Sequence, residues 1–563
     1  HDTTMHTTKK SLRVSFGCLL LSLLPQAVVA QQEKGDLGDK EYIIVKDYRP
    51  VLAESAKISD TPEGDTSTFT APPMQYNLRS KKAETNYETA VIKAVKVKDE
   101  PLPKLYRSLV RGGVGNYTSY LGELYINSLR SKTGSLGLAL RHLSASPNLK
   151  DAGPADFSDN SAMVYGKYFL ENATFDGRIR YDRNVVHYYG YDKNDTVIEK
   201  KDSRQLFGKF GVDLGFGSSE IRKDRINYQG RFGFSTLSDN FAASENEIRV
   251  GLEAGKQVND LYVNLPVSME FFKKKDAEYQ VLSLLSNQSR NIVRLRPEVR
   301  IDREKIRARL GLGFELEKNK KSEFHIFPRF DITAPIADQV LYAFVGADGA
   351  VVKNNFHTLA EENPFITSAI IPLNTIEKLN IRAGLRGNFS STIGFTAGVR
   401  YSTIENLQLF YNDLDYFNKF NVLYDDAKVL NLNAEVIYKS SEKFALSLHV
   451  DQYNYKMDTE AEAWFRPNTE VALRADYNFR DKILLNAAIF ARGPIQARTL
   501  DANGAVAEKI NGWSDANLGV EYKYSKILSG FVRLNNLGFS RYYYWYRYQS
   551  MRFNVMAGVA YSF

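Results

Sequence analysis

Residues 305–317 read KIRARLGLGFELE, and apolar and polar side chains alternate along them one by one. Apolar residues occupy the even positions from 306 to 316, whereas arginine, glycine and glutamate occupy the odd positions. Because successive side chains of a β-strand point to opposite faces, this period of two predicts a strand with one apolar and one polar face. The stretch is longer than the roughly 5–6 residues of an ordinary strand and matches the roughly 9–11 residues of a tilted membrane-spanning strand.

The same alternation continues over residues 105–563, most clearly at 261–271 and 469–480. Short turns such as 259–260 alternate with longer polar or aromatic segments such as 350–376. A soluble sandwich or propeller would not sort its connections so regularly into two length classes. The pattern predicts an all-β fold, a transmembrane antiparallel β-barrel of about 22 strands with short periplasmic turns and long extracellular loops.

The chain ends in FNVMAGVAYSF, residues 553–563, in which Val559, Tyr561 and Phe563 share one face of an extended strand. A barrel has no free edge only when its last strand pairs with its first. We therefore expect this strand to close the barrel. A terminal aromatic residue after alternating apolar residues also resembles the signal that barrel-insertion machinery recognises.

Residues 1–30 have the organisation of a secretory signal peptide. Basic residues precede an apolar run at 14–24, and the small residues Val28-Val29-Ala30 follow it. Residues 31–104 are polar and rich in turn formers, which predicts an extended periplasmic segment without a core of its own. The one cysteine, Cys18, lies in the signal peptide, so we expect no disulfide and no thiol-bound metal in the mature chain.

The composition places the barrel in the outer membrane of a Gram-negative bacterium. Aromatic residues make up 12% of the chain, charged residues 25%, and the formal net charge is +8. After residue 30 we find no apolar run of the roughly 18 residues that a spanning helix needs. The expected partners are outer-membrane lipid, lipopolysaccharide and the barrel-insertion machinery, with stable outer-membrane or periplasmic protein partners also allowed. We expect no nucleic-acid partner.

A family resemblance supports the same architecture. Residues 112–145 (GGVGNYTSYLGELYINSLRSKTGSLGLALRHLSA), followed by YGKYFL and YDRNVVHYYGYD, resemble a family of Bacteroidota barrels described as TonB-dependent-receptor-like. Residues 45–62 (VKDYRPVLAESAKISDTP) are similar to the opening of those chains. True TonB-dependent receptors carry a large folded plug before the barrel, whereas here only residues 31–104 precede it. This departure predicts a barrel without a plug domain and argues against energised transport.

The sequence offers no constellation of catalytic or metal-binding residues. The histidines of the mature chain are scattered, and no HExxH motif or EF-hand spacing is present. No nucleophile or acid pair can be assigned to a histidine. We therefore predict no enzymatic activity, no cofactor and no metal site.

Seven arginines are candidate lumen-lining residues, because the alternation places them on the polar faces of their strands: Arg178, Arg180, Arg294, Arg296, Arg300, Arg307 and Arg309. Aspartate and glutamate are interleaved with them. One interpretation is a pore lining that favours anions. The other, which we favour, is a hydrated wall whose charges pair with one another.

An aromatic run precedes the last strand and contains Tyr543, Tyr544, Trp545 and Tyr546. Tyrosine and tryptophan are enriched both in the aromatic girdles of barrels and in protein–protein interfaces. The run is therefore a candidate partner contact as well as a candidate girdle.

Two functions remain open at this point. The first is a passive pore, like a porin, for small polar or anionic solutes, narrowed by residues 31–104 or by infolded loops. The alternative is a non-enzymatic accessory or scaffold subunit of an outer-membrane complex for protein insertion, secretion or surface export. A segment that adds a strand to a periplasmic partner would fit the alternative.

Overall fold

The computed structural model describes residues 106–129, 131–194, 198–276, 287–303, 306–319, 321–337, 340–413, 417–501 and 504–563. The expected signal peptide and periplasmic segment, residues 1–30 and 31–104, lie outside the described residues. Among the residues described, no helix is long and apolar enough to cross a membrane.

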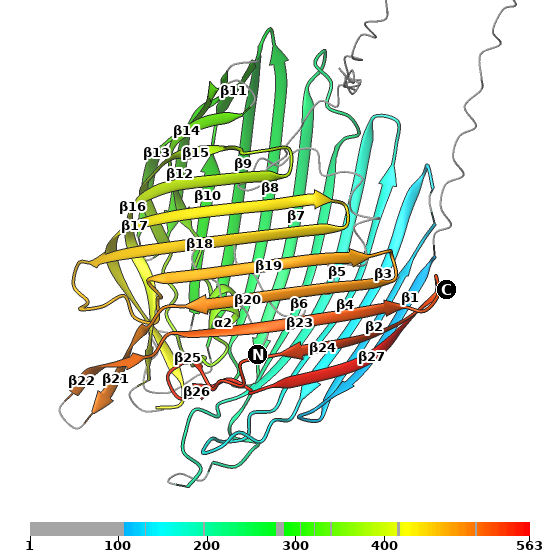
Figure 1. Cartoon of the computed structure of the whole chain (residues 1–563). Helices are drawn as coiled ribbons and strands as arrows, with labels where there is room; N and C mark the ends of the chain where they lie inside the picture. The colour runs from blue at the N-terminus through cyan, green and yellow to red at the C-terminus, as the bar shows by residue number, and fades with distance from the viewer. Residues whose placement is uncertain are drawn as a thin grey trace, which may run out of the picture. The chain divides into compact units, whose positions relative to one another are not determined.

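Nearly all ordered elements are strands (Figure 1). The short helix α2 (Phe356–Glu362) is the exception in the described part of the chain. The strands are, in chain order, β1 (Ser108–Gly115), β2 (Ser119–Asn127), β3 (Gly134–Ala145), β4 (Phe157–Phe169), β5 (Ala173–His187), β6 (Arg204–Ser218), β7 (Asn227–Asp239), β8 (Ser244–Val258), β9 (Leu261–Lys275), β10 (Asn287–Leu295), β11 (Glu298–Arg303), β12 (Ile306–Lys318), β13 (Ser322–Ala337), β14 (Leu341–Val352), β15 (Thr375–Asn388), β16 (Ile393–Asn412), β17 (Phe420–Ser441), β18 (Phe444–Met457), β19 (Thr469–Phe479), β20 (Ile483–Arg492), β21 (Ile495–Asp501), β22 (Gly504–Ile510), β23 (Trp513–Lys523), β24 (Leu528–Asn535), β25 (Tyr543–Trp545), β26 (Tyr548–Gln549) and β27 (Asn554–Ser562).

The side chains of the wall alternate between an outer apolar face and an inner polar face, as the sequence predicts. On β12, Leu310 and Leu312 are each 46% exposed, whereas Glu315 and Glu317 are 0% and 2% exposed. In a membrane barrel, apolar side chains exposed at every second position face the lipid. The polar side chains of the opposite face point into the barrel.

The strands form one closed antiparallel sheet. Each wall strand pairs with the next along the chain, and β27 pairs with β1 in a register that sets Val110 opposite Tyr561. β10 and β11 are one crossing interrupted at Arg296-Pro297, because proline has no N–H for the ladder; both halves pair with β9 and β12. Counted this way, the described residues make a 22-strand barrel, which confirms the predicted fold.

The seam between β1 and β27 is closely packed. Gly113 pairs with Gly558, and the Phe531 ring of β24 lies against both. A Cβ atom added at Gly558 would clash with the carbonyl oxygen of Gly112. Glycine at these positions therefore lets the first and last strands approach each other.

The two ends of the barrel differ in their connections. The backbone of Ser108 exchanges hydrogen bonds with that of Phe563, so β1 begins and β27 ends at the same rim. That rim also carries tight turns such as 259–260 and 442–443. The opposite rim carries the long segments 353–374 and 536–553 and the β21–β22 hairpin. By the layout of outer-membrane barrels, the first rim is periplasmic and the second external.

Candidate functional site

Each of the seven arginines predicted to line the lumen pairs with a carboxylate. On β5, Ile179 is 50% exposed on the outer face, so Arg178 and Arg180 lie on the inner face. The shortest nitrogen–oxygen distances are 3.1 Å for Arg178–Asp213, 2.7 Å for Arg180–Asp182, 2.5 Å for Arg294–Glu270, Arg296–Glu315 and Arg300–Glu298, and 3.2 Å for Arg307–Asp302, while Arg309 pairs closely with Asp331.

These arginines do not form one cluster. Arg294 and Arg296 meet on the shared carboxylate of Glu315, whereas the two arginines of β5 lie beyond the intervening strands β6 to β9. Each of these arginines instead has an acidic partner of its own or shares one with a neighbour. A role for these residues in solute passage stays a prediction.

Helix α2 is held at both ends by groups from distant parts of the wall. Its N-cap, Asn355, accepts a hydrogen bond from the backbone N–H of Thr358 through its side chain, and the Thr358 hydroxyl accepts one from the backbone N–H of Asn355. The buried Glu245 of β8 accepts the backbone N–H groups of Phe356 and His357, at 2.9 and 3.2 Å. A carboxylate at a helix N-terminus satisfies donors that the helix leaves open.

The other end of α2 reaches β16. Gln408 of β16 donates a hydrogen bond to Glu362 at 3.4 Å, and Arg466 lies 3.9 Å from the same carboxylate. Burial raises the pKa of Glu362, and Arg466 opposes that shift. Because β8 and β16 are separated by β9 to β15 in the wall, a helix that touches both lies inside the barrel and bridges these two strands. Figure 1 shows α2 within the ring of strands.

The external segments pack around Tyr548 into a buried aromatic cluster, which we call the cap. It comprises described parts of 188–203, 353–374, 413–420, 458–468 and 541–550. Tyr548 stacks on Phe365 with ring centroids 3.8 Å apart and meets Tyr189 edge-on at 4.7 Å. Its hydroxyl donates to the carbonyl oxygen of Asn418, and burial raises the pKa of Tyr548 well above its usual value. These contacts join loops from opposite sides of the barrel at its external end.

The candidate partner residues Tyr543 to Tyr546 belong to this cap. Trp545 packs on Phe420 and Phe465, with centroids 5.4 and 5.1 Å away. Tyr544 instead faces Trp513 at 5.1 Å. Their role as a partner contact stays a prediction, while Trp545 already has intramolecular aromatic neighbours.

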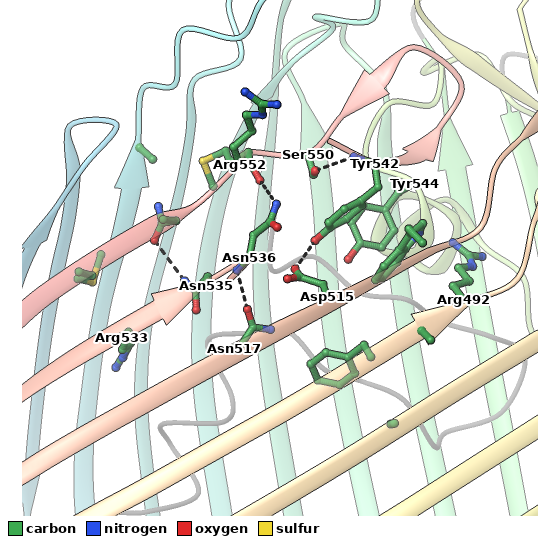
Figure 2. Close-up of a pocket in the computed structure, with 18 of the residues that line it drawn as sticks. Arg492, Asp515, Asn517, Arg533, Asn535, Asn536, Tyr542, Tyr544, Ser550 and Arg552 are labelled. Atoms are coloured by element: carbon green, nitrogen blue, oxygen red, sulfur yellow. Dashed lines mark hydrogen bonds between the residues drawn. The ribbon is translucent and has the colours of Figure 1, made fainter. Parts of the chain in front are cut away.

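A pocket lies between the cap and the wall made by β19, β20, β23, β24 and β27 (Figure 2). Most of its residues come from these strands and from the loop 536–553, and others come from β2, β3, β4 and β18. One side is aromatic: Trp513 stacks face to face on Tyr542 with centroids 4.3 Å apart and planes 14° apart. The hydroxyl of Tyr542 donates to Asp515 at 2.7 Å, which fixes the orientation of this aromatic wall.

The opposite side of the pocket is rich in carboxamides. Asn536 has φ of 51°, a left-handed conformation that asparagine tolerates, and its N–H donates to Asn517 at 3.0 Å. Its side chain donates to the carbonyl oxygens of Ser540 and Met551, at 2.7 and 3.0 Å. Asn536 thus ties both ends of the loop to the wall, as Figure 2 shows in part.

The charged residues of the pocket are arginines in excess of acids. Arg492, Arg533 and Arg552 line the pocket together with two carboxylates, Glu470 and Asp515. Arg492 lies 3.8 Å from Glu470 and donates to the carbonyl oxygen of Phe465 in the cap at 3.4 Å. Arg533 lies 5.1 Å from the ring centre of Phe531. The arrangement suits a solute with flat apolar parts and negatively charged oxygen atoms.

Sequence reasoning missed this pocket, although one signal was available. Trp513, Asp515 and Asn517 alternate along β23 and share its inner face, as do Arg533 and Asn535 on β24. Trp513 and Asp515, at polar-face positions near the external end of β23, could have indicated the site. Nothing in the residues of 536–553 showed that this loop would fold over them.

Comparison with solved structures finds the same barrel in known outer-membrane receptors. The iron transporter FrpB of Neisseria meningitidis (F3-3 variant) matches with a TM-score of 0.64 at 10% identity, covering 82% of each chain. The siderophore receptor PirA of Acinetobacter baumannii matches at 0.64 and 11%, covering 82% of this chain and 81% of that one. A point mutant of the ferric enterobactin receptor of Pseudomonas aeruginosa matches at 0.61 and 12%, covering 81% and 80%. No family model matches this sequence, and no curated protein does.

These comparisons correct the predicted function. The structures that resemble this barrel are described as transporters and receptors, so the prediction of a passive pore is wrong. The sequence analysis allowed for infolded loops, but it did not show that they would pack with α2 into a cap at the external end. The alternative of an accessory subunit gains no support from these matches. The fold is that of an outer-membrane barrel, and it resembles the barrels of TonB-dependent receptors.

Proposed function

We propose that this protein is a gated outer-membrane uptake receptor that binds its solute in the pocket beneath the cap. The observation that carries the proposal is the cap itself, in which α2 bridges β8 and β16 inside the barrel and Tyr548 joins loops from several sides. A cap of packed loops beside a pocket in the wall suits capture followed by release. The barrels that resemble this one are described as iron, siderophore and ferric enterobactin transporters or receptors, which supports the same class of function.

The proposed solute is an anionic aromatic metal chelate of the ferric catecholate class. Such a complex presents flat rings to Trp513 and Tyr542 and charged oxygen atoms to arginine. Stacking of aromatic rings adds about 0.5–1.5 kcal/mol to the free energy gained by burying them. Guanidinium groups bind anionic oxygen atoms with charge-assisted hydrogen bonds. Three arginines and two acids leave the pocket an excess of positive charge for such a solute.

Binding can be measured by tryptophan fluorescence, because all three tryptophans of the chain, Trp464, Trp513 and Trp545, lie in the cap or the pocket. The purified full-length protein is titrated in detergent with the iron(III) tris-catecholate complex. We expect saturable quenching. Titration with free catechol and with iron(III) citrate, an anionic chelate without rings, should give weaker binding or none.

A matched pair of variants tests the position of the site. Tyr542→Ala removes half of the aromatic wall and should weaken binding by about 10-fold or more, given the apolar area it removes. Tyr524→Ala, which removes a 69% exposed tyrosine at the periplasmic rim, should leave binding unchanged. Equal affinity of both variants, or no quenching of the wild-type protein, would contradict the proposal.

The division of the chain forms a second part of the proposal. We propose that the barrel, residues 105–563, folds without the periplasmic segment 31–104, and that the segment serves transport through a periplasmic partner. A chain lacking 31–104 should then bind the chelate with unchanged affinity but fail to support its uptake by cells. Uptake at the wild-type rate by the shortened chain would refute this part.

A further inference from the structure

A group of three potential metal ligands lies at the external end of the β12–β13 hairpin, away from the pocket. Glu317 is on β12, and Glu323 and His325 are on β13, on either side of the turn that joins the two strands. The register places Glu317 directly opposite Glu323. One side-chain donor atom of each residue lies within 4.8 Å of the donor atoms of the other two.

The arrangement is electrostatically unfavourable without a cation. Two carboxylates directly opposite each other on one face of a sheet repel. Glu317 is 2% exposed and accepts one hydrogen bond, from Asn374 at 2.8 Å. Arg290 acts electrostatically on Glu317.

The histidine is oriented toward this group but is not satisfied by it. The Nε2 atom of His325 lies 3.8 Å from Glu317 Oε1, beyond hydrogen-bond distance, and this buried nitrogen has no hydrogen-bond partner. The imidazole ring is held parallel to Phe327, with centroids 5.8 Å and planes 14° apart. Buried polar atoms are normally paired, so an unpaired imidazole nitrogen beside two carboxylates calls for a ligand.

We propose that Glu317, Glu323 and His325 form a binding site for a divalent transition-metal ion, with Zn²⁺ as its best probe. One imidazole and two carboxylates are ligands that zinc accepts, with bonds of about 2.0–2.2 Å. Ligand atoms of a tetrahedral zinc site lie about 3.3 Å apart, a value that follows from those bond lengths. The three donor atoms lie within 4.8 Å of one another, so a small inward movement would bring them to this spacing. The side chain of Glu323 is exposed.

The ion would stabilise the cap. Glu317 is already hydrogen-bonded to Asn374, which ends the segment that carries α2. A metal ion on Glu317 would fix that carboxylate and, through it, the return of this segment to β15. Three protein ligands leave one tetrahedral position for water or for a donor atom of another molecule.

The test is calorimetric titration of the chelator-treated, full-length protein in detergent with ZnCl₂ at neutral pH. We expect one high-affinity ion per chain, and a titration repeated in buffers of different ionisation enthalpy should show whether protons are released. The variants His325→Ala and Glu323→Gln should each weaken zinc binding by about 100-fold or more. Removing a hydrogen-bond partner of a metal ligand typically costs about 10–100-fold in affinity, and removing the ligand itself should cost at least the upper value. Because Glu323 is exposed, its substitution should not impair folding.

The matched control is His142→Ala. His142 lies on β3 on the same face as the exposed Leu140, and its ring nitrogens pair with Asn160 and Ser144 at 2.7 and 3.0 Å. This variant should bind zinc as the wild-type protein does. A wild-type protein that binds no zinc, or Glu323→Gln and His325→Ala variants that keep wild-type affinity, would overturn the proposal. Binding of Ca²⁺ but not Zn²⁺ would also overturn it, because calcium takes oxygen ligands and would leave His325 without a role.

Discussion

The seam of the barrel contains a buried ion pair whose removal should be costly. Arg111 of β1 is 1% exposed and donates to Glu521 of β23 at 2.6 Å, so its side chain reaches across β27 and β24. Its guanidinium lies 4.5 Å from the ring centre of Phe531. The other oxygen of Glu521 accepts a hydrogen bond from Ser529 at 2.7 Å. Arg111→Met keeps most of the side-chain volume and removes the charge.

The expected loss follows from what the substitution leaves behind. Breaking a buried ion pair by removing one partner costs about 3–5 kcal/mol, because the remaining charge stays buried. Since Ser529 continues to bind Glu521, we expect the lower end, about 3 kcal/mol of the free energy of unfolding. The double variant Arg111→Met/Glu521→Gln leaves no buried charge on these two residues and should lose less than the single variant. The second carboxylate near Arg111, Glu123 at 3.9 Å, keeps Arg141 at 3.5 Å in both variants.

The assay is urea unfolding of the purified protein in detergent micelles, followed by tryptophan fluorescence and by the mobility shift of folded barrels on unheated gels. The control is Arg303→Met, whose side chain is 65% exposed and whose partner Asp260 lies 3.3 Å away. An exposed pair contributes about 0–1 kcal/mol, so the control should change little. An Arg111→Met variant no less stable than the control, or a double variant less stable than the single one, would refute this reasoning.

Three further predictions concern the seam, the cap and the external loops. Gly558→Ala should lower the free energy of unfolding by about 1–3 kcal/mol in the same assay, because the added methyl group overpacks the seam. Gly530→Ala, whose added Cβ would meet its nearest atom at 3.9 Å, should leave stability unchanged. Similar losses in both variants would contradict the clash at Gly558. Tyr548→Ala should open the cap, so that the variant, unlike the wild-type protein, shows steady conductance in planar bilayers; a silent variant would argue against a cap that seals the lumen. Burial alone would raise the pKa of Asp156, but hydrogen bonds from Lys200 and a serine outweigh burial and lower that pKa. The Asp156–Lys200 contact should therefore stabilise the loops fully above about pH 4, and this stabilisation should be lost as the pH falls through the lowered pKa of Asp156. Asp156→Asn should therefore melt at a lower temperature than wild type at neutral pH, with the difference shrinking in acid, and a constant difference would exclude this titration.

Much of the barrel could be predicted because its wall is locally encoded. The alternation that puts Leu310 outward and Glu315 inward depends only on the period of a strand. The interruption at Pro297 is a local exception, and it leaves the register of both neighbours intact. The same parity assigned all seven arginines to the polar face, but their pairing depends on which residues the strand register sets opposite them.

The site could not be predicted in this way, because it is built from contacts distant in sequence. Tyr548 meets Phe365 only after two loops from different parts of the barrel fold inward. The grouping of Glu317, Glu323 and His325 needs both the exact turn and the register of one hairpin. The prediction of a passive pore allowed for infolded loops, but the sequence did not show which loops would pack together or what they would enclose.

The pairing of β1 with β27 has a consequence for how the protein is made. β27 follows the other wall strands in sequence and pairs with β1, so the ring cannot close while synthesis or export of β27 is unfinished. Until then both β1 and the newest strand expose unpaired backbone groups, which invite pairing with other chains. Joining segments so far apart in sequence also favours slow folding. Protection of the incomplete sheet from pairing with other chains, and not the stability of the closed barrel, should therefore limit how much of this protein a cell can make.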